Sequence, residues 1–355
     1  MLDDRSLAFL QRLLDAHGPS GFEQEPARLW REEAQAFAAV EVDVAGNSLA
    51  ALNPGGAPRV MLAGHVDEIG VMVVHVDDDG FVHFAAVGGW DSQVLVGQRV
   101  VLQGRGGPVP GVVGKKPIHL IKAEEKDKVS KITDLWLDIG AANRAEALER
   151  VRVGDAGVIA ASSLPLPNGR IASRAVDNRI GAFVVLEALR RLAAAPPAAA
   201  VVAVATTQEE IGTTGGGART SAFGVEPQAA LVVDVTHATD FPGAEKKEQG
   251  DFKLGGGPVL ARGSAVSRVV FDQLVAAAEA EGIPFAIEAT PRYTSTDADA
   301  VYTSRRGVAT GLVSVPCRYM HSPNEMVATE DLDRTAALLA AWVRRLAPST
   351  SFIPA

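Results

Sequence analysis

The sequence predicts an α/β fold, a mostly parallel sheet with helices on both faces, into which a small β-rich domain is inserted. Apolar runs alternate with amphipathic helical patterns near the start of the chain and again from residue 171 onward, which is typical of a covered parallel sheet. Between them, short apolar runs are separated by Gly, Pro and Asp, which indicates strands and turns. We therefore expect an α/β domain made of residues 1–70 and 167–355, and a β-rich insertion at residues 71–166.

The first segment predicts two helices and one buried strand. Apolar side chains recur at helical spacing at Leu7, Leu10, Leu13 and Leu14, and the Gly-Pro pair at residues 18–19 ends that helix. A second helix is expected at residues 25–37. Residues 60–64 are apolar or small, as in a strand buried on both faces.

The insertion is expected to consist of short strands with one helix. Its apolar or alternating runs are VMVVHV, FVHFAAV, RVVLQ, GVVG, LWLDIG and AGVIA. The helix is expected at residues 144–151, and the charged stretch at 123–131 is interpreted as a solvated loop.

The remainder of the chain returns to the α/β pattern. We expect strands at residues 199–205, 230–233 and 311–315. We expect helices at residues 178–194, 268–281 and 329–346.

Composition narrows the classes of function and compartment. The chain has 355 residues, of which 47% are hydrophobic and 22% charged, so it can bury a large core. A net charge of −9 argues against nucleic acid or an anionic membrane as a partner. One cysteine, Cys317, excludes an internal disulfide, and the N-terminus lacks a signal-peptide pattern, so we expect a cytoplasmic protein without a membrane span. Cys317 could be a metal ligand or nucleophile near His321, but a small buried hydrophobe is the favoured interpretation.

Metal-binding side chains occur at or soon after the ends of the expected strands, and at the start of one expected helix. They are His65, Asp177, Glu209, Glu210, Asp234 and His321. Because ligands of open α/β sheets lie beyond the carboxyl ends of the strands, we expect these side chains to converge. Two imidazoles with several carboxylates suit one or two divalent ions, zinc-like by preference. A carboxylate left off the metal would be the general base of a hydrolase.

The adjacent residues Glu209 and Glu210 are expected to have different roles. Neighbours in an extended chain point in opposite directions, so one can hold a metal while the other faces substrate and water. The alternative is a solvated acidic loop. The GTTGGG turn that follows lacks the Lys-Ser/Thr ending of a P-loop, which argues against nucleotide binding.

A supporting role is predicted for Asp67. In a strand, residues two apart share a face, so Asp67 could accept the second ring N–H of His65 and fix its tautomer. The alternative is an ordinary loop carboxylate.

With these motifs assembled, the chain resembles the M42 family of metallo-aminopeptidases, the glutamyl/leucyl/lysyl aminopeptidases of the self-compartmentalising tetrahedral type. The matching motifs span nearly the whole chain in order: PSGFE, AGHVDEIG, VGKKPIHL, DLWLDIG, AVDNRIG, QEEIGTTGG, DVTHATD, STDADAV and YMHSPNE.

The resemblance implies a dinuclear metal centre. His65 and His321 would each bind one ion, Asp177 would bridge the two ions, and Glu210 and Asp234 would be the remaining terminal ligands. Nitrogen and oxygen ligands suit zinc, cobalt and manganese, and we expect zinc or cobalt first, with manganese as a further candidate.

The resemblance also implies a mechanism and an assembly. Glu209 would be the general base that takes a proton from a water held between the metals, Asp67 would support His65, and the 177–178 peptide would be cis. The protein would be an aminopeptidase that removes N-terminal residues from short peptides with a free amino terminus. The fold would be that of dinuclear zinc peptidases, with the β-rich insertion as a dimerisation domain and dimers assembled into a hollow dodecamer.

Several points stay open in the sequence. Ser295 replaces a glycine that relatives often carry, which leaves the role of Thr296-Asp297 undecided. His119 either reaches a neighbouring subunit's site or is structural, and the second is favoured. The preferred N-terminal residue of the substrate, the native metal, and the choice between dimer and dodecamer are not predicted.

Three other functions compete with this one. A deblocking or N-acyl-amino-acid hydrolase would use the same metals on a different bond. A glycosidase needs two carboxylates about 5–9.5 Å apart and no metal, which does not suit the histidine-rich set. A catalytically inactive scaffold with a peptidase fold would be expected to have lost a ligand or the base, and none is missing here.

Overall fold

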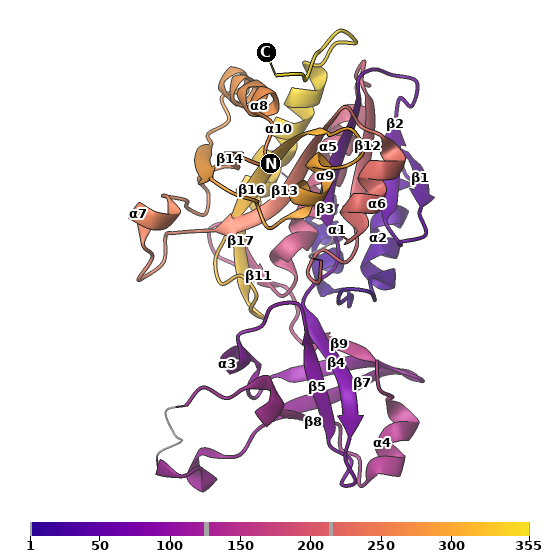
Figure 1. Cartoon of the computed structure of the whole chain (residues 1–355), viewed down its shortest axis with the longest axis vertical. Helices are drawn as coiled ribbons and strands as arrows, with labels where there is room; N and C mark the ends of the chain where they lie inside the picture. The colour runs from indigo at the N-terminus through magenta and orange to yellow at the C-terminus, as the bar shows by residue number, and fades with distance from the viewer. Residues whose placement is uncertain (1, 124–127, 213–215, 355) are drawn as a thin grey trace.

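The computed structural model of the chain describes residues 2–123, 128–212 and 216–354. It contains an α/β unit and, below it in Figure 1, a smaller β-barrel. Part of the charged stretch at 123–131 and part of the GTTGGG turn lie outside the described residues.

The α/β unit is built on an eight-stranded sheet with the order β1-β2-β12-β3-β13-β16-β14-β15. Four neighbouring pairs are parallel (β12 with β3, β3 with β13, β13 with β16, and β14 with β15), which confirms the mostly parallel sheet. The strands are β1 Ala39–Val42, β2 Ser48–Leu52, β3 Arg59–His65, β12 Ala200–Thr206, β13 Ala229–His237, β14 Val259–Gly263, β15 Ala286–Thr290 and β16 Ala309–Cys317.

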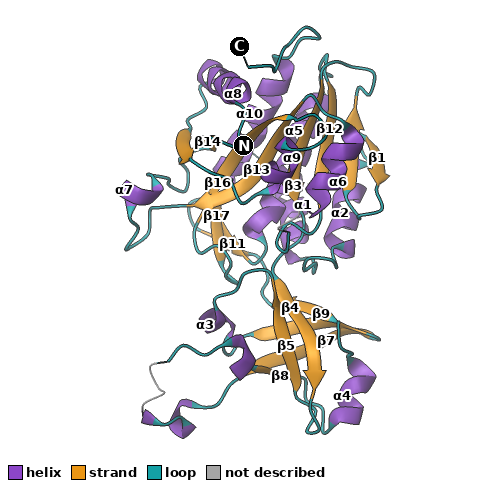
Figure 2. Cartoon of the chain, viewed as in Figure 1, coloured by secondary structure: helices purple, strands orange, loops and turns teal. Residues whose placement is uncertain are grey.

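Helices cover both faces of this sheet, as expected (Figure 2). One layer contains α1 Asp4–Asp15, α2 Gln24–Ala34, α5 Val176–Ala193, α8 Arg268–Glu281 and α10 Thr329–Arg344. The opposite layer contains α6 Gly216–Val225 and α9 Asp297–Tyr302. Alternation along β13 divides the core, because Leu231 and Val233 pack in the first layer while Ala230 and Val232 pack in the second.

Each of the six apolar runs of the insertion forms one strand of a closed barrel, with the order β4-β5-β8-β7-β6-β9. The strands are β4 Gly70–Val76, β5 Val82–Val87, β6 Arg99–Gly104, β7 Gly107–Gly114, β8 Trp136–Asp138 and β9 Ala156–Ile159. Closure pairs every strand on both sides, and the barrel has an apolar core of its own. The expected helix is α4 Arg144–Arg150. The assignment of residues 71–166 to one domain stays a prediction.

Three short strands form a second small sheet beside the main one. They are β10 Leu164–Leu166, β11 Arg170–Ser173 and β17 Glu325–Ala328, and they are antiparallel. Their register sets Ser173 opposite Glu325, which brings the chain before α5 next to the chain after β16. The other helical turns of the described residues are α3 Ser92–Leu95, α7 Lys246–Gln249 and the 3₁₀ turns Ile118–Leu120 and Ile132–Asp134.

A buried ionic cluster joins the N-terminal helix to the centre of the unit. Arg179 of α5 is fully buried, and its guanidinium donates to the Leu13 and Ala16 carbonyls at the end of α1. The Glu68 carboxylate, just beyond β3, accepts from both Arg179 and Arg174. Buried charges need such partners, so this cluster fixes α5 relative to β3 and α1. None of the helices in the described ranges combines the length and the hydropathy of a membrane-spanning segment.

Candidate metal centre

The acidic and histidine side chains singled out in the sequence meet at the carboxyl edge of the central strands. His65 is the last residue of β3, and Glu209 and Glu210 lie in the loop after β12. Asp177 lies in the irregular first turn of α5, where φ and ψ are −75° and 106°. His321 lies in the loop after β16. These side chains therefore meet where ligands of parallel α/β sheets are expected, at the carboxyl ends of the strands. Asp177 and His321 reach this edge from segments that are not strands.

Two placements differ from the expected ones. The strand expected at 230–233 extends to His237, so Asp234 lies inside β13, paired in register with Ser314, and not beyond the strand end. The reason is the parallel pairing of β13 with β16, which continues through the apolar pair Val235 and Val315 to His237 and Cys317. His65 likewise ends its strand, where it was expected just past the end.

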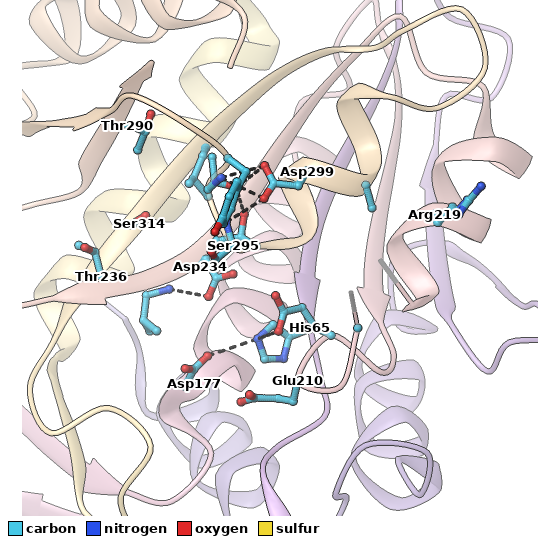
Figure 3. Close-up of a pocket in the computed structure, with 18 of the residues that line it drawn as sticks. His65, Asp177, Glu210, Arg219, Asp234, Thr236, Thr290, Ser295, Asp299 and Ser314 are labelled. Atoms are coloured by element: carbon cyan, nitrogen blue, oxygen red, sulfur yellow. Dashed lines mark hydrogen bonds and ion pairs between the residues drawn. The ribbon is translucent and has the colours of Figure 1, made fainter. Parts of the chain in front are cut away.

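The carboxylate of Asp177 lies between the imidazoles of His65 and His321. Figure 3 shows Asp177 beside His65. Its Oδ1 is 3.3 Å from His65 Nε2, and its Oδ2 is 3.4 Å from His321 Nε2. The peptide bond between Asp177 and Asn178 is cis, as the family resemblance implied.

The adjacent glutamates divide between the two imidazoles. Glu209 Oε2 lies 3.7 Å from His65 Nε2, and Glu210 Oε2 lies 3.3 Å from His321 Nε2. Ligand atoms of His65, Asp177 and Glu210 lie within 4.8 Å of one another, and so do those of His65, Glu209 and Asp234. Both glutamates are thus close enough to share in binding cations.

The side chains alone carry an excess of negative charge. Burial, with Asp234 and Asp297 nearby, raises the pKa of Glu209 to about 10. Burial and Asp177 raise the pKa of Glu210 to about 7. Buried Asp234 also has a pKa well above its ordinary value. Such a group of carboxylates favours the uptake of positive charge, either protons or cations.

The imidazoles respond to the same charges. Hydrogen bonds with Asp177 and Glu210 raise the pKa of His321 to about 11. Burial alone would lower the pKa of His65, but Glu209, Asp177 and Asp67 together raise it well above its ordinary value.

The donor set fits divalent cations. Among the described residues, Glu210 Oε1 is buried without a hydrogen-bond partner, so this oxygen is free to bind a cation. Imidazole nitrogens and carboxylate oxygens are the ligands of zinc and of neighbouring first-row metals.

The carboxylate of Asp67 lies where a supporting residue is needed, although β3 ends before it. Its Oδ1 is 3.3 Å from His65 Nδ1 without the alignment of a hydrogen bond. It also accepts from the backbone N–H groups of Glu209 and Glu210, at 3.2 and 3.1 Å. Asp67 therefore holds the loop that carries both glutamates, a contact that the sequence pattern did not indicate.

Sequence reasoning missed Glu325, although it lies within the quoted YMHSPNE motif. This side chain is 2% exposed. Its Oε1 accepts from the backbone N–H of His321 at 2.8 Å, and its Oε2 accepts from that of Asp177 at 2.9 Å. One carboxylate thus fixes two segments that carry cluster residues, and only the motif itself signalled it.

Replacing Glu325 by glutamine is expected to weaken metal binding about tenfold or more, because its amide would face one backbone N–H and release one of the two segments. The dissociation constant of the metal, measured by competition with a chelating dye, checks this. Asp331→Asn is the matched control, since buried Asp331 also accepts from two backbone N–H groups, those of Gly255 and Gly257. If the two variants bound the metal with equal affinity, Glu325 would not position the metal ligands.

The cluster opens into a cavity of about 1570 Å³ lined by residues of β13, β15, α6 and α9. Thr296 lines this cavity, whereas Asp297 is buried and accepts from Thr206 Oγ1 at 2.5 Å. Ser295 has a φ of 58°, a region that favours glycine.

Cys317 and His119 lie outside the cluster. Cys317 is buried in β16, as a small hydrophobe would be, and burial raises the pKa of its thiol well above the ordinary value. His119 lies exposed in a 3₁₀ turn of the barrel segment, so it does not pack in a core.

Comparisons with known proteins agree with this geometry. The sequence model of the M42 glutamyl aminopeptidase family matches residues 46–338. The lysyl aminopeptidase of Pyrococcus furiosus is 34% identical over 349 residues, which cover 96% of this chain and 97% of that protein. The structure of the TET aminopeptidase from the marine sediment archaeon Thaumarchaeota archaeon SCGC AB-539-E09 superposes with a TM-score of 0.92 at 34% identity, covering 97% of each chain.

A further solved structure concerns assembly. The TET1 peptidase of Pyrococcus horikoshii, described as able to assemble into a tetrahedron or a large octahedral shell, is 31% identical with a TM-score of 0.85. The match covers 96% of this chain and all of that one (100%).

Proposed function

Because the chain belongs to the M42 glutamyl aminopeptidase family, we propose that it is a dinuclear metal-dependent aminopeptidase acting on short peptides. The observation that carries the proposal is the Asp177 carboxylate, which lies between two imidazoles that each also approach one of the adjacent glutamates. Two cations sharing one carboxylate would be held by such an arrangement.

We assign the ligands as the family resemblance implies. His65 and Asp234 would hold one ion, His321 and Glu210 the other, and Asp177 would belong to both. The short distances of Glu210 and Asp177 to His321 support the second set. Divalent ions bound there, zinc or cobalt first and manganese next, would supply Lewis acidity that lowers the pKa of water and polarises a carbonyl.

Glu209 is assigned as the general base that takes a proton from the attacking water. Its side chain lines the cavity, so a water and a peptide can reach it, while its backbone N–H is fixed by Asp67. Glu209 would accept the proton of the attacking water and later give it to the leaving amine.

The acidic surroundings also favour a free amino terminus on the substrate. The carboxylates that are not assigned to the ions, those of Glu209 and Asp297, would attract an ammonium group, whereas an acylated terminus offers no charge. This selects removal of the first residue over cleavage within a chain.

We further propose that the chain forms a homo-oligomer through its barrel. The TET1 peptidase, described as assembling into a tetrahedron or a large octahedral shell and also as a dodecamer, supports a closed assembly. For this chain we propose dimers that assemble into a dodecamer, with the insertion as the dimerisation domain. Apolar side chains near the barrel, such as Ile118, Leu120 and Val129, are exposed in the single chain and are available for such a contact. The expected location in the cytoplasm stays a prediction.

The test is hydrolysis of peptide pairs that differ only in N-acetylation, by protein stripped with a chelator and refilled with zinc or cobalt. We expect release of the first residue from the free peptide only. Cleavage of the acetylated peptide would instead indicate a deblocking or N-acyl-amino-acid hydrolase. No cleavage of either peptide by the metal-loaded protein would indicate an inactive scaffold.

A further inference from the structure

The cavity beside the metal centre has two ends of opposite charge. In Figure 3, Thr236 and Thr290 lie on one side of His65 and Asp234, and Arg219 lies on the other. Glu288 of β15 lines the cavity on the threonine side, since its Oε1 accepts from Thr236 Oγ1 at 2.9 Å. The metal centre therefore lies between an acidic end and a basic end.

The acidic end lies about the length of one long side chain away from the metal centre. Asp234 and Thr236 lie two residues apart on β13 and face the same side of the sheet, so their Cα atoms are roughly 6.6 Å apart. The Glu288 carboxylate adjoins Thr236. The four-carbon stem of lysine, or the longer side chain of arginine, spans a distance of this order.

The charge of Glu288 lacks a strong partner in the protein. No lysine or arginine among the described residues makes an ion pair with it, and only the exposed imidazole of His237 acts on it electrostatically. Glu288 is partly buried, and its one recorded hydrogen bond comes from a neutral hydroxyl. A partly buried carboxylate of this kind is suited to bind a cation from solution.

The basic end differs from the acidic end, because one of its charges is paired and the end is open to solvent. Arg305 is already paired, because it lies 3.0 Å from Glu226 and stacks over the Phe223 ring at 3.9 Å. Arg219 and Phe223 are exposed on α6, so this end of the cavity is open to solvent. A peptide chain of variable length can leave by this open end, whereas the partly buried Glu288 carboxylate at the other end can meet the first side chain.

We propose that Glu288 is a specificity-determining residue that binds the cationic side chain of an N-terminal lysine or arginine of the substrate. The inference rests on the proposed aminopeptidase function and adds the class of residue that is removed. The rest of the peptide then extends toward Arg219, whose charge suits the carboxylate end of a short peptide.

The test compares lysine and norleucine, which have the same stem with and without the ammonium group. For amide substrates of the metal-loaded protein, we expect kcat/KM to be about tenfold or more higher for lysine than for norleucine. Glu288→Gln should bring this ratio near one by slowing lysine alone, because the amide can still accept from Thr236. Glu288→Asp should give an intermediate ratio, and Arg219→Gln, at the opposite end, should leave it unchanged.

Binding of lysinamide and norleucinamide to the same proteins, measured by calorimetry, separates this inference from the proposed function. If no amide is cleaved, the function fails, but tighter binding of lysinamide that is lost in Glu288→Gln still supports the role of Glu288. Equal binding of both amides by the unaltered protein would overturn it. So would a preference for N-terminal glutamate that disappears in Arg219→Gln, because the peptide would then lie in the reverse direction.

Discussion

Replacing Glu209 by glutamine is expected to lower kcat about 10²–10⁴-fold while the protein keeps its full metal content. Glutamine matches the shape of glutamate but cannot accept a proton. The hydrogen bond from the backbone N–H of residue 209 to Asp67 does not involve the side chain, so the loop should stay in place. Steady-state kinetics, combined with metal analysis of the same sample, measures both quantities.

The neighbouring variant Glu210→Gln provides the matched control. Its side chain lies 3.3 Å from His321, so we expect it to lose metal as well as activity. The account of Glu209 would be wrong if Glu209→Gln lost a metal ion and Glu210→Gln did not. Glu209 would then be a ligand, a role that its proximity to His65 and Asp234 permits.

Replacing His321 by alanine is expected to reduce the metal content from two ions per subunit to one. The imidazole is one of the side chains assigned to the second ion, and it is partly exposed, so its removal should disturb the core little. Turnover should fall by about 10²-fold or more, since one of two cations that share the work of charge stabilisation is lost. Elemental analysis after dialysis against a buffered metal concentration gives the stoichiometry.

His237→Ala is the control for this variant. His237 also lines the cavity, but it is exposed and lies outside the cluster. It should keep two ions. If the His321 variant also kept both ions with unchanged affinity, His321 would not be a ligand.

Much of the fold follows from local sequence patterns. Each apolar run of the insertion became a barrel strand, and the helix expected at 268–281 has those bounds, because these segments alternate or repeat with a clear period. The short strands β1, β2, β14 and β15 were not expected. They lie toward the edges of the sheet, where half-exposed residues blur the pattern.

The sequence predicted which residues with metal-binding side chains form the candidate site. It did not predict the contacts that hold these residues in place. His65, Asp234 and the adjacent glutamates could be grouped because strand ends meet at one edge of a parallel sheet. Glu325 acts on backbone N–H groups of residues far away in the chain, and such hydrogen bonds leave no periodic signal. Glu288 reaches the cavity only through the pairing of β15 with β14, a long-range contact that no local pattern encodes.

The central claim is that two cations held by this cluster enable hydrolysis. It is tested most directly by titrating the chelator-stripped protein with zinc or cobalt while following release of the first residue from a free peptide. The account predicts no turnover without metal and a rise that ends at two equivalents per subunit. Full turnover by protein shown to contain no metal, or a rise complete at one equivalent, would contradict it.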